Sequence, residues 1–251
     1  MTPTPVGMRC PECSREKTRV TRMTADRPAP TVTQVLIGIN IAVFIAQALT
    51  GGGFASGGRG SLMVNGELYG PFVAYKHEYY RLVTSGFMHA GFFHLFMNMI
   101  FIWILGQMLE PRLGSARFLM LYMVSLLCGS MGAMLIEPTV PVVGASGAAF
   151  GLLGAALVMH LREGLDLRDS PLMPVLVINL VITFVVPGIA IGAHVGGVIG
   201  GFIAGWLLEE VDSRAGRAAS LLAAGALGVI AVVVAIAAAG GGGLLTGQPG
   251  L

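Results

Sequence analysis

The residues that could do chemistry are polar side chains set within long apolar stretches of the sequence. Ionisable side chains are costly at membrane depth, so their presence in such stretches indicates a functional site. The candidates are His89, His94, Asn98, Ser146, His160 and His194. A serine hydroxyl within hydrogen-bond reach of an imidazole is an activated nucleophile, so these residue types favour acyl transfer. His160, next to Arg162, is expected at a membrane interface instead of in a site.

The apolar stretches that carry these residues are long enough to cross a membrane. Of the 251 residues, 55% are hydrophobic and 11% are charged, whereas an ordinary globular protein has roughly 25% charged residues. Six charge-free gaps could each hold a span of about 20 residues, and Pro187-Gly188 divides one of them in two. Seven membrane helices are therefore predicted, at 32–49, 87–108, 116–136, 144–161, 172–187, 190–208 and 218–239. This pattern excludes a disordered chain, a nucleic-acid-binding module and a disulfide scaffold.

The distribution of basic residues predicts the orientation of these helices. Loops on the N-terminal side of the membrane hold twelve Lys and Arg residues, and loops on the other side hold three. By the positive-inside rule, the N-terminus is expected in the cytoplasm and the Gly-rich C-terminus outside a multi-pass cell-membrane protein. No small-residue cleavage site follows the first apolar run, so we read it as a retained helix and not as a signal peptide.

This topology brings three of the predicted spans into register. The second, fourth and sixth spans all enter from the outer face, which places His94, Ser146 and His194 at similar depth. His94 is expected roughly 10 Å below the start of its helix. Asn98 follows His94 by four residues and shares its helix face. His89 faces elsewhere unless that helix begins later.

The surroundings of the serine strengthen its candidacy. Ser146 lies in Gly144-Ala-Ser-Gly147 at the start of a predicted helix, where free backbone N–H groups can stabilise an oxyanion. Small residues then recur at every fourth position in the fourth and sixth spans, a pattern that lets membrane helices approach closely. The two stripes are Gly147-x-x-x-Gly151-x-x-x-Ala155 and Gly197-x-x-x-Gly201-x-x-x-Gly205. Taken alone, such a pattern more often reflects plain helix packing than a functional site.

Taken together, these motifs resemble the rhomboid family of intramembrane serine proteases. The matching segments are His89-x-x-x-x-His94-x-x-x-Asn98, Gly144-Ala-Ser-Gly-Ala-Ala-Phe150, Gly192-Ala-His194-x-x-Gly197-x-x-x-Gly201, Glu110-Pro-Arg112 and Tyr80-Arg81. The Tyr-Arg pair stands where Trp-Arg is common in the family. The resemblance implies an all-α membrane protein with a cytoplasmic tail (1–31), a six-helix catalytic core (32–210) and a seventh C-terminal transmembrane helix with a Gly-rich tail (211–251).

The resemblance also assigns roles to the polar residues. Ser146 would be the nucleophile and His194 the general base, a dyad without a carboxylate. No Asp or Glu lies in the outer half of any predicted span, so the sequence offers no obvious third member. His94 and Asn98, with the backbone N–H of Ser146, would hold the oxyanion.

Three further residues would support this site. Gly144 would keep the space beside the serine open. Phe150 would pack against the His194 ring, where many relatives have Tyr. His89 would support the oxyanion region or a local water network.

The function implied is a serine endopeptidase that cuts single-pass membrane proteins in or near their transmembrane segments, in the lipid bilayer and without a cofactor or nucleic acid. Two alternatives stay open: a catalytically inactive relative that binds and escorts membrane proteins, and a transporter or channel. Inactive relatives usually lack the serine or the histidine. Transport folds often contain matching halves, and none is evident here.

Two remaining features lie outside the predicted spans. Cys10-Pro-Glu-Cys13 has the spacing of half a zinc knuckle, but a closed structural site needs four ligands, so no metal is assigned. The long loop from Thr50 to Arg81 contains an aromatic, amphipathic stretch at Tyr69–Tyr75, which is expected to lie at the membrane interface.

Overall fold

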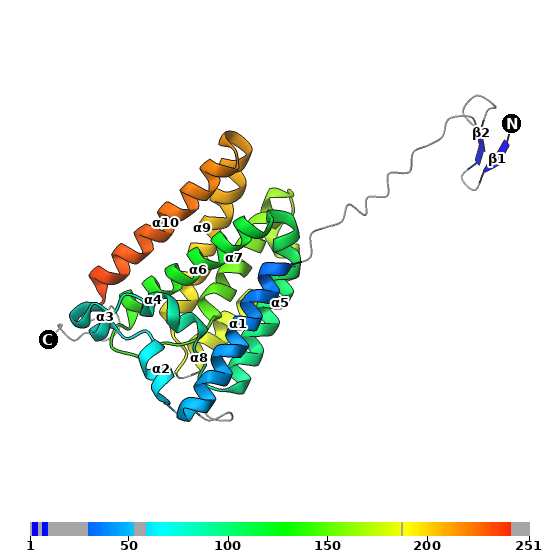
Figure 1. Ribbon diagram of the computed structural model, residues 1–251. Helices are drawn as coiled ribbons and strands as arrows, with labels where there is room; N and C mark the ends of the chain where they lie inside the picture. Colours follow the sequence, from blue (N-terminus) through cyan, green and yellow to red (C-terminus); the bar gives the residue numbers. More distant parts are fainter. Residues whose placement is uncertain (1, 5–6, 10–29, 53–58, 187, 242–251) are drawn as a thin grey trace.

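The computed structural model describes residues 2–4, 7–9, 30–52, 59–186 and 188–241. Among these residues, seven helices form a bundle (Figure 1). They are α1 (Thr31–Gln47), α5 (Phe92–Leu113), α6 (Ser115–Ile136), α7 (Ser146–Arg162), α8 (Leu172–Val185), α9 (Ile191–Ala215) and α10 (Arg217–Ala238). One helix lies in each region where the charge-free gaps predict one.

Five of these helices are long and apolar enough to cross a membrane, namely α1, α5, α6, α9 and α10. The helices α7 and α8 are apolar but shorter, with 17 and 14 residues. The chain is therefore a multi-pass helical membrane protein. Of the seven predicted spans, five are therefore helices of full membrane-spanning length, and α7 and α8 are shorter.

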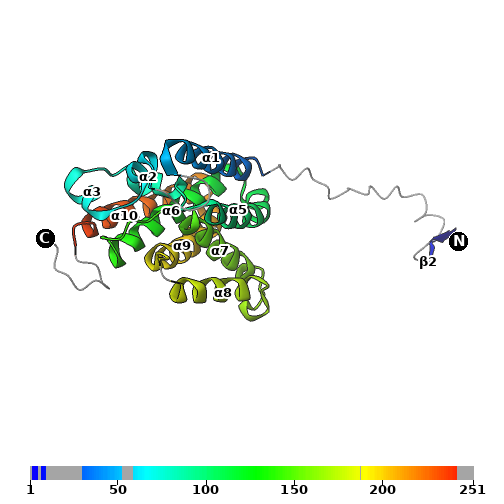
Figure 2. The ribbon, with the colours of Figure 1, turned by 90° about the horizontal axis from the view of Figure 1, so that it is seen from below.

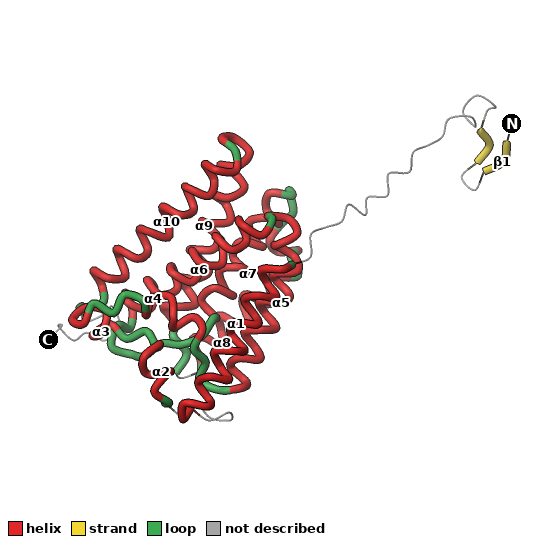
Figure 3. The backbone as a smooth tube through the Cα atoms, in the orientation of Figure 1, coloured by secondary structure: helices red, strands yellow, loops and turns green. Residues whose placement is uncertain are grey.

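The remaining described elements are short. Between α1 and α5 lie a π turn (Ala48–Gly52), α2 (Ser61–Gly66), α3 (Gly70–Lys76), α4 (Arg81–Thr84) and a 3-10 turn (Ser85–Phe87). A second 3-10 turn, Leu167–Asp169, precedes α8. Figure 3 shows α2–α4 near the loops at one end of the bundle. Near the N-terminus, β1 (Thr2–Thr4) and β2 (Gly7–Arg9) pair antiparallel, with Pro3 opposite Met8. The Cys10 and Cys13 pair lies outside the described residues.

Three helix boundaries differ from the sequence prediction by five or more residues. Helix α5 begins at Phe92 and not at 87, because the chain first makes the 3-10 turn at Ser85–Phe87. His94 therefore lies in the first turn of α5, and the prediction that it sits roughly 10 Å down the helix is wrong. Helix α5 also runs on through Pro111 to Leu113, and α9 continues to Ala215.

The centre of the bundle is formed by α6, α7 and α9, whose backbones lie almost in contact. A Cβ at Gly197 would lie 2.1 Å from the carbonyl oxygen of Gly147, and one at Gly201 would lie 2.0 Å from that of Gly151. The stripes of small residues on α7 and α9 thus face each other. In Figure 2, α1 and α8 lie along opposite edges of the bundle.

Arg81 anchors the long connection between α1 and α5. Its side chain is 2% exposed and donates hydrogen bonds to the carbonyl oxygens of Val64 (2.8 Å) and Glu67 (2.7 Å). It also donates to the Glu78 carboxylate (2.6 Å), and this hydrogen bond lowers the pKa of Glu78. The guanidinium lies over the Phe72 ring at 4.6 Å. One buried cation therefore ties together α2, α3 and α4.

Glu110 connects α5 to the start of α1. The N-cap of α1 is Pro30, which provides no side-chain cap. Instead, the buried Glu110 carboxylate accepts hydrogen bonds from the backbone N–H groups of Val32 (2.9 Å) and Thr33 (2.8 Å). It also accepts from the hydroxyls of Thr33 and Ser115, both at 2.8 Å. A carboxylate at a helix N-terminus is favourable both as a cap and toward the helix dipole.

We expect Glu110→Gln to lower the free energy of unfolding by about 2–3 kcal/mol. The glutamine amide has an NH2 group in place of one carboxylate oxygen, and this group would face N–H and O–H donors that need an acceptor. The measurement is unfolding of the purified protein in mixed micelles. Glu163→Gln is the matched control. Glu163 is half-exposed and pairs with Arg112 at the same end of the bundle, so its loss should change stability by less than about 1 kcal/mol. Equal stability of Glu110→Gln and wild type would contradict this role.

Ion pairs link the ends of α5, α6, α7 and α9. Arg112 in the last turn of α5 pairs with Glu163 and Glu209, and Arg162 at the end of α7 pairs with Glu209 and Glu210. Two further pairs are Arg117–Asp212 and Arg214–Glu210. In α5, α7 and α9, the polar candidates other than His160 lie in the first two turns, and these ion pairs lie at the opposite helix ends. Glu110 and Arg112, which belong to one of the segments that resemble the family, therefore make contacts between helix ends.

Candidate active site

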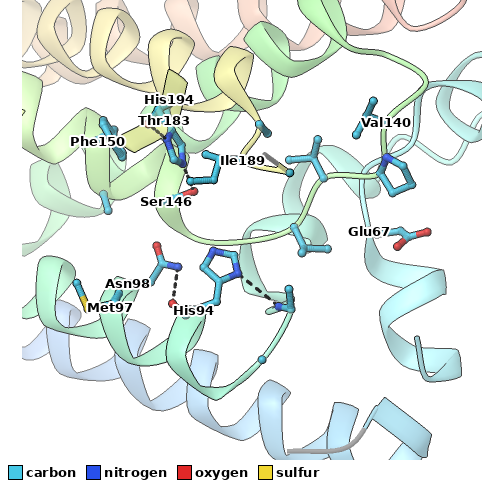
Figure 4. A pocket seen from close by; sticks show the side chains of 18 of the residues that line it. Glu67, His94, Met97, Asn98, Val140, Ser146, Phe150, Thr183, Ile189 and His194 are labelled. Carbon is cyan, nitrogen blue, oxygen red and sulfur yellow. Dashed lines mark hydrogen bonds between the residues drawn. The ribbon is translucent and has the colours of Figure 1, made fainter. Parts of the chain in front are cut away.

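Ser146 and His194 are hydrogen-bonded to each other. Ser146 is the first residue of α7, and His194 is in the first turn of α9. The Oγ of Ser146 lies 2.8 Å from Nε2 of His194 (Figure 4). The two side chains come from helices whose glycine stripes permit backbone contact just beyond them. This is the geometry in which an imidazole can remove the proton of a hydroxyl.

The ring of Phe150 fixes the plane of the His194 imidazole. The two ring centroids are 4.2 Å apart and their planes differ by 18°, which is a stacked arrangement. Phe150 is buried and lies one turn after Ser146 on α7. Stacking of this kind uses only the face of the aromatic ring. A Phe at this position can therefore hold the His194 ring without the hydroxyl that a Tyr would carry.

Gly144 lies between the serine and His94. Its backbone φ is +123°, a value that residues other than glycine rarely adopt. A Cβ at this position would lie 2.6 Å from the His94 ring and 3.6 Å from Oγ of Ser146. Only glycine therefore leaves the space between the serine and His94 free of a side chain.

Two donors from α5 face the same space. Asn98 is buried and donates one amide hydrogen to the carbonyl oxygen of His94 (2.8 Å), which leaves a second amide hydrogen for another acceptor. The N–H of Ala90 donates to Nδ1 of His94 (3.4 Å). A neutral His94 ring with this contact carries its proton on Nε2, the atom that would lie 2.7 Å from a Cβ at Gly144.

His89 precedes α5 and lies behind His94. The two ring centroids are 5.2 Å apart in an edge-on arrangement. The His89 backbone is held by the amide of Gln47, which donates to its carbonyl oxygen (3.3 Å) and accepts from its N–H (3.0 Å). Nε2 of the buried His89 has no hydrogen-bond partner among the described residues. His160 lies at the far end of α7, where its Nε2 contacts the carbonyl oxygen of Asp166 (3.1 Å).

The serine opens into a cavity of about 1110 Å³. Its walls include His94 and Asn98 from α5, Phe150 from α7 and Thr183 from α8. Its outer part is lined by the connection residues Arg59, Glu67 and Val140, and Figure 4 shows the side chains of Glu67 and Val140 on the side away from Asn98. The space is large enough for a peptide segment to reach the hydroxyl.

The sequence analysis missed two polar residues of this cavity. Thr183 contacts the second ring nitrogen of His194, and Asn179 lies four residues before it on α8. Both are uncharged, so the cost of an ionisable side chain at membrane depth does not draw attention to them. Their spacing of four within an apolar span is the signal that could have identified them, since it places both on one helix face.

The fold and site together define a multi-pass helical membrane protein that holds a serine hydroxyl against an imidazole beneath a loop-covered cavity. The family model described as the rhomboid domain matches residues 76–211, which is more than half of the chain. The chain belongs to the rhomboid family.

Several curated proteins are similar to this chain. "Rhomboid protease GluP" of Bacillus subtilis (strain 168) is 34% identical over 154 residues, which cover 60% of this chain and 29% of that protein. "Putative rhomboid protease YdcA" of the same organism is 47% identical over 85 residues, covering 34% of this chain and 43% of that protein. "Inactive RHOMBOID-like protein 8" of Arabidopsis thaliana is 33% identical over 103 residues, covering 41% and 29%. The chain thus spans less than half the length of each of these relatives.

Proposed function

We propose that this protein is an intramembrane serine endopeptidase. The observation that carries the proposal is the 2.8 Å contact between Ser146 Oγ and His194 Nε2 at a cavity large enough for a peptide. Membership of the rhomboid family, with relatives named as proteases, supports the same activity.

The mechanism follows from the geometry of the site. Ser146 Oγ attacks a peptide carbonyl while His194 Nε2 takes the hydroxyl proton. The carbonyl oxygen becomes an oxyanion, which receives hydrogen bonds from the Ser146 backbone N–H, the second amide hydrogen of Asn98 and Nε2–H of His94. His194 then returns the proton to the leaving amine, and a water molecule hydrolyses the acyl-enzyme. Gly144 keeps the space for the carbonyl free, and Phe150 keeps the imidazole plane aligned.

The substrate class follows from the location of the site. A half-buried serine among apolar helices can meet a membrane-embedded polypeptide, so single-pass membrane proteins are the proposed substrates. A transmembrane helix holds its carbonyls in backbone hydrogen bonds, and it must unwind locally before attack. Substrate segments that contain Gly or Pro are therefore favoured.

The proposed topology has six helices in the catalytic core, α1 and α5–α9, with α10 as a seventh span. The excess of basic residues on the N-terminal side supports a cytoplasmic location of that side, and the catalytic cavity and the C-terminus would then lie on the opposite face.

The test is labelling of the purified full chain with a fluorophosphonate, a probe that reacts with activated serines. We expect a covalent adduct on Ser146 in the wild type, and at least about 100-fold slower labelling in His194→Ala. The alternative function is a binding or escort protein without catalysis, since one relative is named as inactive. No adduct on the folded wild type would contradict protease function and favour that alternative.

A further inference from the structure

Thr183 is a buried polar residue on α8 that contacts the His194 ring. Among the described residues of α8, it alone is buried, with 2% of its surface exposed. Its neighbours Ile182, Phe184 and Val185 are exposed and apolar, as expected for a helix at the edge of the bundle. Its hydroxyl Oγ1 lies 2.7 Å from Nδ1 of His194, the ring nitrogen that does not face Ser146.

The direction of this hydrogen bond follows from the second contact of the same hydroxyl. Oγ1 of Thr183 donates its single hydrogen to the carbonyl oxygen of Asn179, at 2.7 Å, as threonines within helices commonly do. Toward His194 the hydroxyl can then act only as an acceptor. Nδ1 must therefore carry the ring proton. Nε2 of the neutral ring is left with a lone pair, directed at Ser146 Oγ.

We propose that Thr183 is the positioning residue of His194 and takes the place that a carboxylate has in a serine triad. This inference rests on the proposed function. A hydrogen-bonded series runs from Ser146 through His194 and Thr183 to the carbonyl oxygen of Asn179. It holds the imidazole in the tautomer that can accept the serine proton. It also provides an acceptor for Nδ1–H when the ring becomes charged during the reaction.

A hydroxyl suits this position better than a carboxylate would. An ionised Asp inside an apolar helix is strongly unfavourable at membrane depth, whereas a threonine that bonds its own helix is tolerated. The acidic side chains that line the same cavity, Glu67 and Glu137, come from its connections and not from α8. Glu67 is engaged by Arg59. Among the described residues, His194 has no hydrogen bond to a carboxylate.

The first test compares Thr183→Val, which keeps the shape and removes the hydroxyl, with Thr183→Ser, which keeps the hydroxyl. For cleavage of a membrane reporter, Thr183→Val should lower kcat by about 10- to 100-fold with KM within about twofold. Thr183→Ser should stay within about threefold of the wild type. Thr50→Val is the matched control, because the Thr50 hydroxyl also donates to a carbonyl four residues earlier (3.0 Å to Ala46) but lies in the π turn after α1, away from His194.

The second test needs no variant of Thr183 and no catalysis. In 15N-histidine NMR spectra of the wild type, the signals that disappear in His194→Ala should show the Nδ1–H tautomer. An Nε2–H tautomer, or a Thr183→Val enzyme within twofold of wild type, would overturn the inference. So would a Thr183→Ser enzyme as impaired as Thr183→Val, because shape and not the hydroxyl would then matter. If the wild type shows the Nδ1–H tautomer but neither cleaves nor labels, the proposed function fails and the role in catalysis falls with it.

Discussion

Purified Ser146→Ala protein is expected to lose at least about 1000-fold in the rate of cleavage of a membrane-anchored reporter, because removal of a serine nucleophile leaves only residual catalysis from the rest of the site. Among the described residues, the Ser146 hydroxyl is hydrogen-bonded to His194 alone, and Ser146 is the first residue of α7. Its removal should therefore leave insertion and thermal unfolding close to those of the wild type. The measurement is product formation in proteoliposomes, with unfolding followed on the same samples.

Ser220→Ala provides the control for this substitution. Ser220 lies in the first turn of α10, where its hydroxyl bonds the carbonyl oxygen of Arg217 (2.9 Å). It therefore resembles Ser146 in its place on a helix but has no imidazole beside it, and its replacement should leave cleavage unchanged. Undiminished cleavage by purified Ser146→Ala would refute serine catalysis at this site.

The second large effect is expected at Gly201, remote from the reacting atoms. A Cβ here would lie 2.0 Å from the carbonyl oxygen of Gly151, and backbone atoms cannot move aside as a flexible side chain can. Gly201→Ala must therefore separate α7 from α9. We expect it to lower the free energy of unfolding by about 3 kcal/mol or more. Because Ser146 and His194 stand at the starts of these same helices, fluorophosphonate labelling of the protein that still folds should also slow.

Gly38→Ala separates this effect from the general consequences of replacing glycine. A Cβ at Gly38 on α1 would meet nothing within 4 Å. The higher helix propensity of alanine should then leave stability equal or raise it by up to about 1 kcal/mol. If Gly201→Ala unfolded and labelled like the wild type, close contact between α7 and α9 would not be what brings the two side chains together.

The sequence predicted the helices well where one physical signal dominated. Long gaps without charge mark each of the seven long helices, since a charged side chain is unfavourable in an apolar environment. The stripes of small residues on α7 and α9 could also be recognised in the sequence. In the structure they face each other, which explains why residues 146 and 194 meet. The roles of His94, Asn98 and His89 stay predictions that mutagenesis has to test.

Other features were not predictable because they depend on tertiary contacts. Hydropathy does not distinguish the 3-10 turn at Ser85–Phe87 from the start of a helix, so the beginning of α5 was placed too early. A proline inside a helix usually ends or kinks it, yet α5 continues past Pro111 to Leu113. Glu110 lies just beyond the predicted end of the second span at residue 108, and only the structure reveals that it caps α1. In the sequence, Thr183 is one more residue of an apolar span, and only the structure reveals its contact with His194 on α9.

The placement of the ion pairs has a consequence for how the protein responds to its medium. Exposed charges are screened beyond about 10 Å at 0.1 M salt, and these pairs join the helix ends opposite to those that carry Ser146 and His194. Six of the eight ion pairs among the described residues lie at that end, so ionic strength acts mainly there, whereas the reacting side chains lie at the other end. A concentrated salt solution should shorten the lifetime of the folded protein in detergent well before it slows a single turnover.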